Sequence, residues 1–157
     1  MAPTPRFFED FTVGLRFRSF GGIPVTAERI RSFAAEFDPQ PFHLDDEAGR
    51  DSLFGGLVAS GWHTAAVAMR LIVDSDLGLS GRGAGVAIES MRWRLPVRAG
   101  DVLRVQGTVT ETRPSRSQTD RGIVKVQATV HNQHDEAVLE AMHVVMMLRR
   151  GVSPIVG

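Results

Sequence analysis

The chain has 157 residues, of which 43% are hydrophobic; this length allows one sizeable core and is too short for two independent domains, so we expect a single domain over 1–157 with its core at about 7–150. Its 18 Lys and Arg residues balance its 18 Asp and Glu residues, which excludes a general attraction to nucleic acid or to an anionic membrane. Because there is no cysteine, disulfides and thiolate chemistry are excluded as well.

The N-terminal residues lack the apolar segment of a secretory signal peptide, and no run approaches the roughly 18 apolar residues that cross a bilayer. We therefore expect a cytoplasmic protein with no membrane partner. A net charge of zero removes electrostatic repulsion between copies of the chain, so it permits self-association.

The first part of the chain is predicted to form a short strand and a helix. Residues 15–25 combine β-favouring residues with a Gly-Gly pair and a proline, which predicts a strand leading into a turn. The helix that follows is capped by Thr26 and stopped by Asp38-Pro39. Its apolar face repeats at helical spacing and comprises Ile30, Phe33, Ala34 and Phe37.

The segment DPQPFHLD comes next and holds two prolines, which predict a stiff, non-helical loop. The charged residues 45–47 are typical of a helix start. A longer helix is predicted from about Ser60, and because apolar residues lie on nearly all of its faces we expect it to be buried. Trp62 and Trp93 are expected in the core or in the wall of a pocket.

Four strands are predicted over 86–95, 103–112, 123–131 and 138–148, separated by turns rich in Pro, Gly, Ser, Asn and Asp. Both faces of the last strand are apolar, which indicates a central position covered on both sides. The order of elements predicts an α+β fold in which an antiparallel sheet wraps around a buried central helix. Since such a sheet keeps an open edge, we expect pairing with a second copy as a homodimer or higher homo-oligomer.

Asp38 and His43 flank the two prolines of D-P-Q-P-F-H, so a carboxylate and an imidazole are displayed on a segment with little conformational freedom. General acid and base catalysis needs groups that are positioned in advance and exchange protons near neutral pH, and imidazole meets this need without adjustment. The alternative is structural: Asp38 only ends the helix, and His43 is a loop histidine with satisfied hydrogen bonds.

The segment FGGLVASGWH places glycines and Ser60 immediately before the longer helix. A helix start exposes unpaired N–H groups and the positive end of the helix dipole, and Gly61 lets a ligand oxygen approach the backbone closely. These features predict an oxyanion site. The alternative is that the glycines only permit tight turns and close packing.

The two segments D-P-Q-P-F-H-L-D and S-L-F-G-G-L-V-A-S-G-W together resemble the hydratase motif of the MaoC-like (R)-specific enoyl-CoA hydratases. An opening F-x-x-F-x-V-G and a later R-W-R-L-P-V-R-A-G-D are also similar to this family, so the resemblance covers most of 7–148. It implies a hot-dog fold in which Asp38 and His43 activate a water and handle the proton given to the α-carbon. It also implies that the backbone N–H of Gly61 binds the thioester oxygen, with coenzyme A as part of the substrate and no other cofactor.

Five residues around these motifs are expected to contact the substrate: Gln40, Ser60, Trp62, His63 and Arg116. Gln40 stands where the family motif has Asn, and Met69 lies near a position where some members have a helix serine. His63 borders the oxyanion glycine, with packing or helix capping as the alternative. Arg116 is expected to pair with the phosphates of coenzyme A, with a solvated strand face as the alternative. The other histidines show no metal-like grouping, so no metal site is expected.

The leading hypothesis is an enzyme that reversibly hydrates a trans-2-enoyl-CoA to an (R)-3-hydroxyacyl-CoA, that is, an enoyl-CoA hydratase or acyl dehydratase. One alternative is a hot-dog thioesterase, in which a carboxylate directs water at the thioester carbonyl. Another is a hot-dog protein that binds acyl-CoA without catalysis, because a fold does not guarantee an activity.

Overall fold

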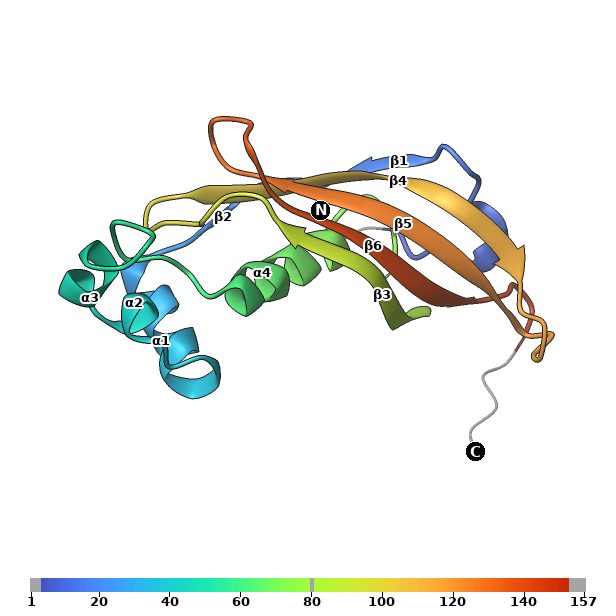
Figure 1. Cartoon of the computed structure of the whole chain (residues 1–157). Coiled ribbons are helices and arrows are strands. Elements are labelled where there is room, and N and C mark those ends of the chain that lie inside the picture. The colour runs from blue at the N-terminus through green and yellow to red at the C-terminus, as the bar shows by residue number, and fades with distance from the viewer. Residues whose placement is uncertain (1–3, 80, 153–157) are drawn as a thin grey trace.

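An antiparallel sheet curves around one helix in the computed structural model, which describes residues 4–79 and 81–152 (Figure 1). The strands lie in the order β1-β4-β5-β6-β3, and the short β2 pairs with β4. The predicted α+β architecture is therefore confirmed. The strands are β1 (Arg16–Arg18), β2 (Ile23–Pro24), β3 (Gly83–Trp93), β4 (Val102–Pro114), β5 (Arg121–His131) and β6 (Ala137–Leu148).

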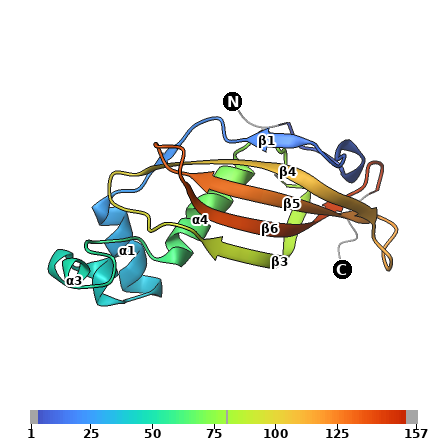
Figure 2. The same cartoon turned by 45° about the horizontal axis from the view of Figure 1, so that its top comes forward.

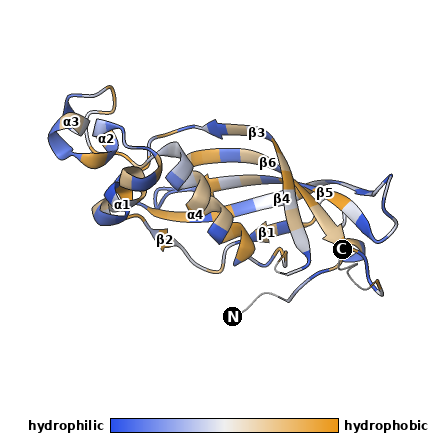
Figure 3. Cartoon of the chain, turned by 90° about the horizontal axis from the view of Figure 1, so that it is seen from below, coloured by the Kyte–Doolittle hydropathy of each residue, from blue (hydrophilic) through white to orange (hydrophobic). Residues whose placement is uncertain are grey.

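The inner face of the sheet is apolar because successive side chains of a strand point to opposite faces. In β5 the even-numbered residues from Gly122 to Val130 are buried, and the odd-numbered residues between them are partly exposed. The register carries this face across the sheet, since Val126 pairs with His143 of β6 and His143 pairs with Ile88 of β3. Figure 3 shows the central helix α4 lying across this face.

The helix α4 (Gly61–Val73) is covered on one side only. Val67, Ala68 and Leu71 are buried, whereas Trp62 is 61% exposed and Met69 is 43% exposed. The expectation of a helix buried all round is therefore wrong for the single chain, and Trp62, which was expected in the core or in the wall of a pocket, does not belong to the core. The uncovered side of α4 faces β3, which lies at the edge of the sheet and is exposed along most of its length.

Strand β6 lies between β5 and β3, in the interior of the sheet, as its apolar sequence predicts. Its inner face is buried, for example at Leu139 and Ala141. On its outer face Met142 and Met146 are only partly buried, so the expectation of cover on both sides is wrong.

Three helices lie beyond one end of the sheet, beside the beginning of α4 (Figure 2). They are α1 (Ala27–Phe37), α2 (Pro41–Leu44) and α3 (Asp46–Arg50). Helix α1 begins where predicted, because the Thr26 hydroxyl accepts a hydrogen bond of 3.2 Å from the Arg29 N–H. It ends at Asp38, also as predicted. Phe37, which was expected on its apolar face, is 63% exposed.

Helix α2 corrects the expectation of a non-helical loop over DPQPFHLD. Pro41 occupies the first helical position of this single turn. The N–H of that position has no partner within a helix, so its absence in proline costs nothing there, and the fixed φ of proline suits a helix start. The prolines therefore stiffen the segment by starting a helical turn rather than by preventing one.

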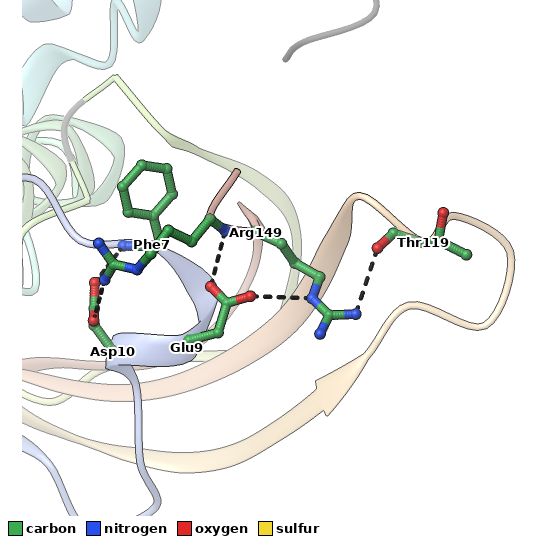
Figure 4. A network of polar contacts seen from close by, with 6 residues as sticks. Phe7, Glu9, Asp10, Thr119 and Arg149 are labelled. Carbon is green, nitrogen blue, oxygen red and sulfur yellow. Dashed lines mark hydrogen bonds and ion pairs between the residues drawn. The ribbon is translucent and has the colours of Figure 1, made fainter. Parts of the chain in front are cut away.

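A network of polar contacts joins the N-terminal 3-10 helix η1 (Phe8–Asp10) to the residues after β6 (Figure 4). Glu9 accepts hydrogen bonds from the side chain of Arg149 at 3.1 Å and from the backbone N–H of Arg150 at 3.0 Å. Asp10 accepts from the Arg150 side chain at 2.6 Å. Several linked charges hold a chain segment better than one exposed ion pair does, so this network fastens η1 to the far end of the sheet.

Candidate active site

Asp38 and His43 meet between α1 and α2. Asp38 is the residue at which α1 ends, and His43 lies in the single turn of α2. The Nε2 atom of His43 is 3.3 Å from Oδ2 of Asp38. The imidazole is buried, whereas the carboxylate keeps about a quarter of its side-chain surface exposed. The structure therefore brings together the two residues that the sequence motif separates by four others.

The hydrogen bond on the other side of the imidazole determines where its proton lies. His43 Nδ1 is 2.7 Å from the backbone carbonyl oxygen of Val58. A carbonyl oxygen only accepts, so Nδ1 carries the hydrogen and donates it. In the neutral imidazole Nε2 then presents a lone pair toward Asp38. The lone pair and the carboxylate both accept hydrogen bonds, and a water molecule has two hydrogens to donate.

Ser60 holds the carboxylate in place. Its hydroxyl donates a hydrogen bond of 2.6 Å to Oδ2 of Asp38 and accepts one of 3.2 Å from the backbone N–H of Trp62. Ser60 is completely buried and is the N-cap of α4. Its hydroxyl is thus engaged with Asp38 and the helix. We had expected Ser60 to contact the substrate, and the structure instead gives it a contact with the expected catalytic carboxylate.

Gly61 is the first residue of α4, and Trp93 packs directly against it. A Cβ atom at Gly61 would lie 2.8 Å from the indole ring, and the indole N–H donates a hydrogen bond of 2.8 Å to the Gly61 carbonyl. The space freed by the missing side chain is thus filled by Trp93. The backbone N–H of Gly61 lies in the first turn of a helix, where such groups have no helical partner, and Gly61 lines the same pocket as His43.

Two pockets flank the uncovered side of α4. The first, of about 400 Å³, contains His43, Gly61 and Trp93 among its lining residues and is bounded by the β3–β4 connection. The second, of about 530 Å³, lies between the later turns of α4 and the strands β3 and β6. Gly61, Ala65 and Met69 are spaced four residues apart and so form one stripe on α4 that runs from the first pocket to the second.

Trp62 and His63 lie outside the first pocket. Trp62 is largely exposed and meets Trp93 edge to face at a ring distance of 5.6 Å. His63 is buried between α1 and α4, where it stacks on Phe33 at 4.9 Å. Burial lowers the pKa of His63, and the charge of Arg29 lowers it further. The structure therefore places His63 as a packing residue on the other side of the helix.

Gln40 and Arg116 are also not brought to the pocket. Gln40 is exposed and serves through its backbone as the N-cap of α2. Arg116 lies in the β4–β5 hairpin, beyond the pair formed by Pro114 and Gly122. The pocket lies at the opposite end of the strands, and the 11 residues of β5 separate the two ends by roughly 30 Å. Within one chain Arg116 therefore lies far from Asp38, and its pairing with the phosphates of coenzyme A stays a prediction.

The structure places at the site two residues that the sequence did not point to: the Val58 carbonyl orients His43, and Thr64 lines the first pocket. Trp93 forms the wall of this pocket. Trp93 had been expected in the core or in a pocket wall, and with 45% of its surface exposed it is a wall residue. One indication of the role of Trp93 was present in the sequence, because this residue lies in the segment R-W-R-L-P-V-R-A-G-D, which is similar to a segment of the family.

No three His, Cys, Asp or Glu side chains gather into a metal-binding group within residues 4–79 and 81–152. In that same part of the chain, no helix has both the length and the apolar character that a membrane span needs.

Comparisons with known proteins agree with this architecture. The family model described as "MaoC like domain" matches residues 12–132. The chain is 30% identical over 141 residues to the uncharacterized protein YdeM of Bacillus subtilis, an alignment that covers 90% of this chain and 98% of that protein. It is 31% identical over 113 residues to the 3-hydroxybutyryl-CoA dehydratase of Methylorubrum extorquens, covering 70% of this chain and 68% of that enzyme.

Among solved structures, the MaoC-like dehydratase from Rhodospirillum rubrum superposes with a TM-score of 0.87 at 49% identity, covering 94% of this chain and 99% of that one. The R-hydratase PhaJ1 from Pseudomonas aeruginosa superposes with a TM-score of 0.72 at 20% identity, covering 95% and 94%. The second likeness concerns the fold alone. Together these neighbours confirm the hot-dog fold that the sequence motifs imply.

Proposed function

The chain belongs to the family of MaoC-like domains, and we propose that it is an enoyl-CoA hydratase that reversibly converts a trans-2-enoyl-CoA thioester into an (R)-3-hydroxyacyl-CoA. The observation that carries the proposal is the contact between Asp38 and His43, in which Oδ2 of the carboxylate and Nε2 of the imidazole lie 3.3 Å apart. The likeness to a 3-hydroxybutyryl-CoA dehydratase supports the same reaction class.

In the proposed reaction a water donates one hydrogen bond to His43 Nε2 and the other to Asp38. The water oxygen bonds to the β-carbon while Nε2 takes one of its protons. The electrons of the double bond move to the α-carbon and the thioester, and the imidazolium then returns the proton to the α-carbon. Water is thus added without a net gain or loss of protons by the enzyme, and both new bonds form on one face of the substrate.

The backbone N–H of Gly61 is the group that we propose binds the thioester oxygen. It lies at the positive end of the dipole of α4, where negative charge is stabilised, and it lines the same pocket as His43. Negative charge develops on this oxygen when water adds to the β-carbon, so a fixed donor there lowers the barrier. Coenzyme A enters as part of the substrate, and this chemistry needs neither a metal nor a further cofactor.

The acyl chain is proposed to extend along the stripe of Gly61, Ala65 and Met69 toward the second pocket. That pocket is lined mainly by aliphatic and methionine side chains and by glycines, and burial of apolar surface is the main source of affinity for a hydrocarbon chain. The substrate class that fits this arrangement is an enoyl thioester with an apolar chain beyond the reacting carbons.

The test is ultraviolet-monitored hydration of a panel of trans-2-enoyl-CoA thioesters. Asp38→Asn and His43→Ala are each expected to lower kcat by at least about 100-fold, and the double variant by a similar factor, because the two residues act as a unit. The matched controls are Asp51→Asn and His134→Ala, which change exposed residues outside the pocket. Full activity in either dyad variant contradicts the proposal.

The same assay separates the other readings of the site. Release of free thiol from the thioester identifies a thioesterase, whereas loss of enoyl absorbance with the thioester intact identifies a hydratase. Tight binding of acyl-CoA with neither change identifies a binding protein.

We also propose that the chain forms a homodimer through β3. This edge strand has no partner on its outer side among the described residues, and large apolar side chains stay exposed beside it, namely Trp62, Met69, Val86, Ile88, Trp93 and Leu95. An unpaired, apolar edge favours pairing with another strand. Sedimentation of the wild type is expected to give twice the mass of the chain, and Ile88→Lys is expected to give the monomer. A monomeric wild type at micromolar concentration contradicts this proposal.

A further inference from the structure

His143 is a buried imidazole in an otherwise apolar pocket. It lies on the inner face of β6 and is only 7% exposed. The other residues that line the second pocket are glycines, alanine, aliphatic residues and a methionine. Among the described residues, the side-chain nitrogen that is buried from solvent and has no hydrogen-bond partner is Nδ1 of His63, not a nitrogen of His143. The nitrogens of His143 have no hydrogen-bond partner in that part of the chain either, and they open toward the pocket.

A buried polar group without a partner costs free energy, and a group that supplies the missing hydrogen bond is bound favourably. The nitrogens of His143 are not sealed in the empty pocket, but a chain that fills the pocket either supplies them with a hydrogen-bond partner or leaves them without one. A leucine at this position would fill the same space without that cost. The choice of histidine therefore points to a ligand that carries a polar atom into the second pocket.

The register gives the position of His143 along the proposed path of the acyl chain. Trp93, in the wall of the first pocket, pairs with Leu139, and Ile88 pairs with His143. His143 lies four positions after Leu139 along β6, which corresponds to about 13 Å. His143 thus lies well beyond the reacting carbons, at a depth that the distal part of a medium-length acyl chain reaches.

We infer that His143 selects acyl chains that carry an uncharged hydroxyl or carbonyl oxygen in their distal part. This inference rests on the proposed function, because it uses the same substrate path. A neutral imidazole offers one donor and one acceptor, which match a hydroxyl group. Burial lowers the pKa of His143 and so keeps the ring neutral at pH 7. A carboxylate would meet no positive charge in this pocket, and its transfer out of water would cost free energy.

The test compares three trans-2-enoyl-CoA thioesters of one medium chain length whose chains end in a methyl, a hydroxyl or a carboxylate group, repeated at several lengths. At the chain length that brings the hydroxyl group beside His143, the wild type is expected to give a higher kcat/KM for the hydroxyl chain than for the methyl or the carboxylate chain. His143→Leu is expected to lower the hydroxyl-to-methyl ratio of kcat/KM about tenfold. His134→Leu, which makes the same exchange at an exposed histidine outside both pockets, is the matched control and keeps the wild-type ratio.

A binding measurement separates this inference from the proposed reaction. Calorimetric titration of Asp38→Asn with the same thioesters needs no turnover, so a preference for the hydroxyl chain in binding supports the inference even where hydration fails. His143→Gln, which keeps hydrogen-bonding groups, is expected to retain part of the preference. Equal binding of the hydroxyl and methyl chains by a protein with an intact His143, at every length, overturns the inference however the variants behave.

Discussion

Replacing Ser60 separates the two tasks of its hydroxyl group. Ser60→Ala removes an N-cap, which costs about 1 kcal/mol, and a hydrogen bond of 2.6 Å to Asp38. Bonds to charged groups contribute about 1.5–3 kcal/mol, and the lower end applies here because the carboxylate is partly exposed and regains water. The expected loss in the free energy of unfolding is therefore about 2–3 kcal/mol, which for this chain length lowers Tm by about 5–10 °C.

Ser60→Gly is the matched variant, because glycine is nearly as good an N-cap as serine yet has no hydroxyl group. We expect it to be more stable than Ser60→Ala by about 0.5–1 kcal/mol in urea unfolding. Both variants free Asp38 from its anchor, so both are expected to lower kcat by a similar factor, about 10- to 100-fold, since small displacements of a reacting group cost this much.

Activities of Ser60→Ala and Ser60→Gly that differ in the same order as their stabilities would refute this reasoning. If Ser60→Gly hydrated enoyl-CoA at the wild-type rate while Ser60→Ala did not, the serine would matter only as a helix cap. Wild-type activity in both folded variants would mean that Asp38 needs no anchor. The assay is the hydration of one enoyl-CoA at a temperature well below both Tm values.

Two further predictions concern packing and pH. Gly61→Ala places a methyl group 2.8 Å from the Trp93 ring, so it is expected to lower the free energy of unfolding in urea by about 1–3 kcal/mol. In a Trp93→Ala background the same substitution should lower it much less. An equal loss in both backgrounds would contradict the packing of Trp93 against Gly61. Burial lowers the pKa of both His143 and His63 below the ordinary value of 6.5, so the unfolded chain binds protons that the folded chain does not. The free energy of unfolding is then highest above about pH 6.5 and falls as the pH drops through the lowered pKa values. His143→Leu should make this fall shallower, and an unchanged slope would show that His143 does not contribute to it.

Local periodicity predicted the four long strands, because alternation of apolar and polar residues reports directly which side of a strand is buried. The predicted and observed strands differ only by a few residues at their ends. The helix start at Ser60 was also predictable, since serine next to a helix is a local capping signal. Both signals lie within one element and need no knowledge of the rest of the fold.

The errors depend on contacts that local patterns do not report. Helix α4 was expected to be buried all round because its composition is apolar, but the single chain covers one side and leaves Met69 open beside the edge strand β3. Arg116 was assigned to the phosphates of coenzyme A by its chemistry alone, and no local pattern reported that its hairpin lies at the end of the sheet away from Asp38. The packing of Trp93 against Gly61 was not predicted either, because the two residues lie 32 positions apart in the sequence; this contact leaves the proposed role of the Gly61 N–H unchanged.

Two hydrogen bonds orient the side chains of Asp38 and His43, the pair that we propose reacts with the substrate. The Val58 carbonyl keeps the proton on Nδ1 of His43 and so keeps Nε2 free. Ser60 donates a hydrogen bond to Oδ2 of Asp38, the oxygen that lies 3.3 Å from Nε2 of His43, and so fixes the carboxylate beside the imidazole. Because Val58 and Ser60 belong to the short segment that leads into α4, the same segment orients both side chains and begins the helix that covers the sheet. A change that loosens this segment therefore disturbs the fold and the proposed chemistry together, and the Ser60 variants are informative because they divide these two effects.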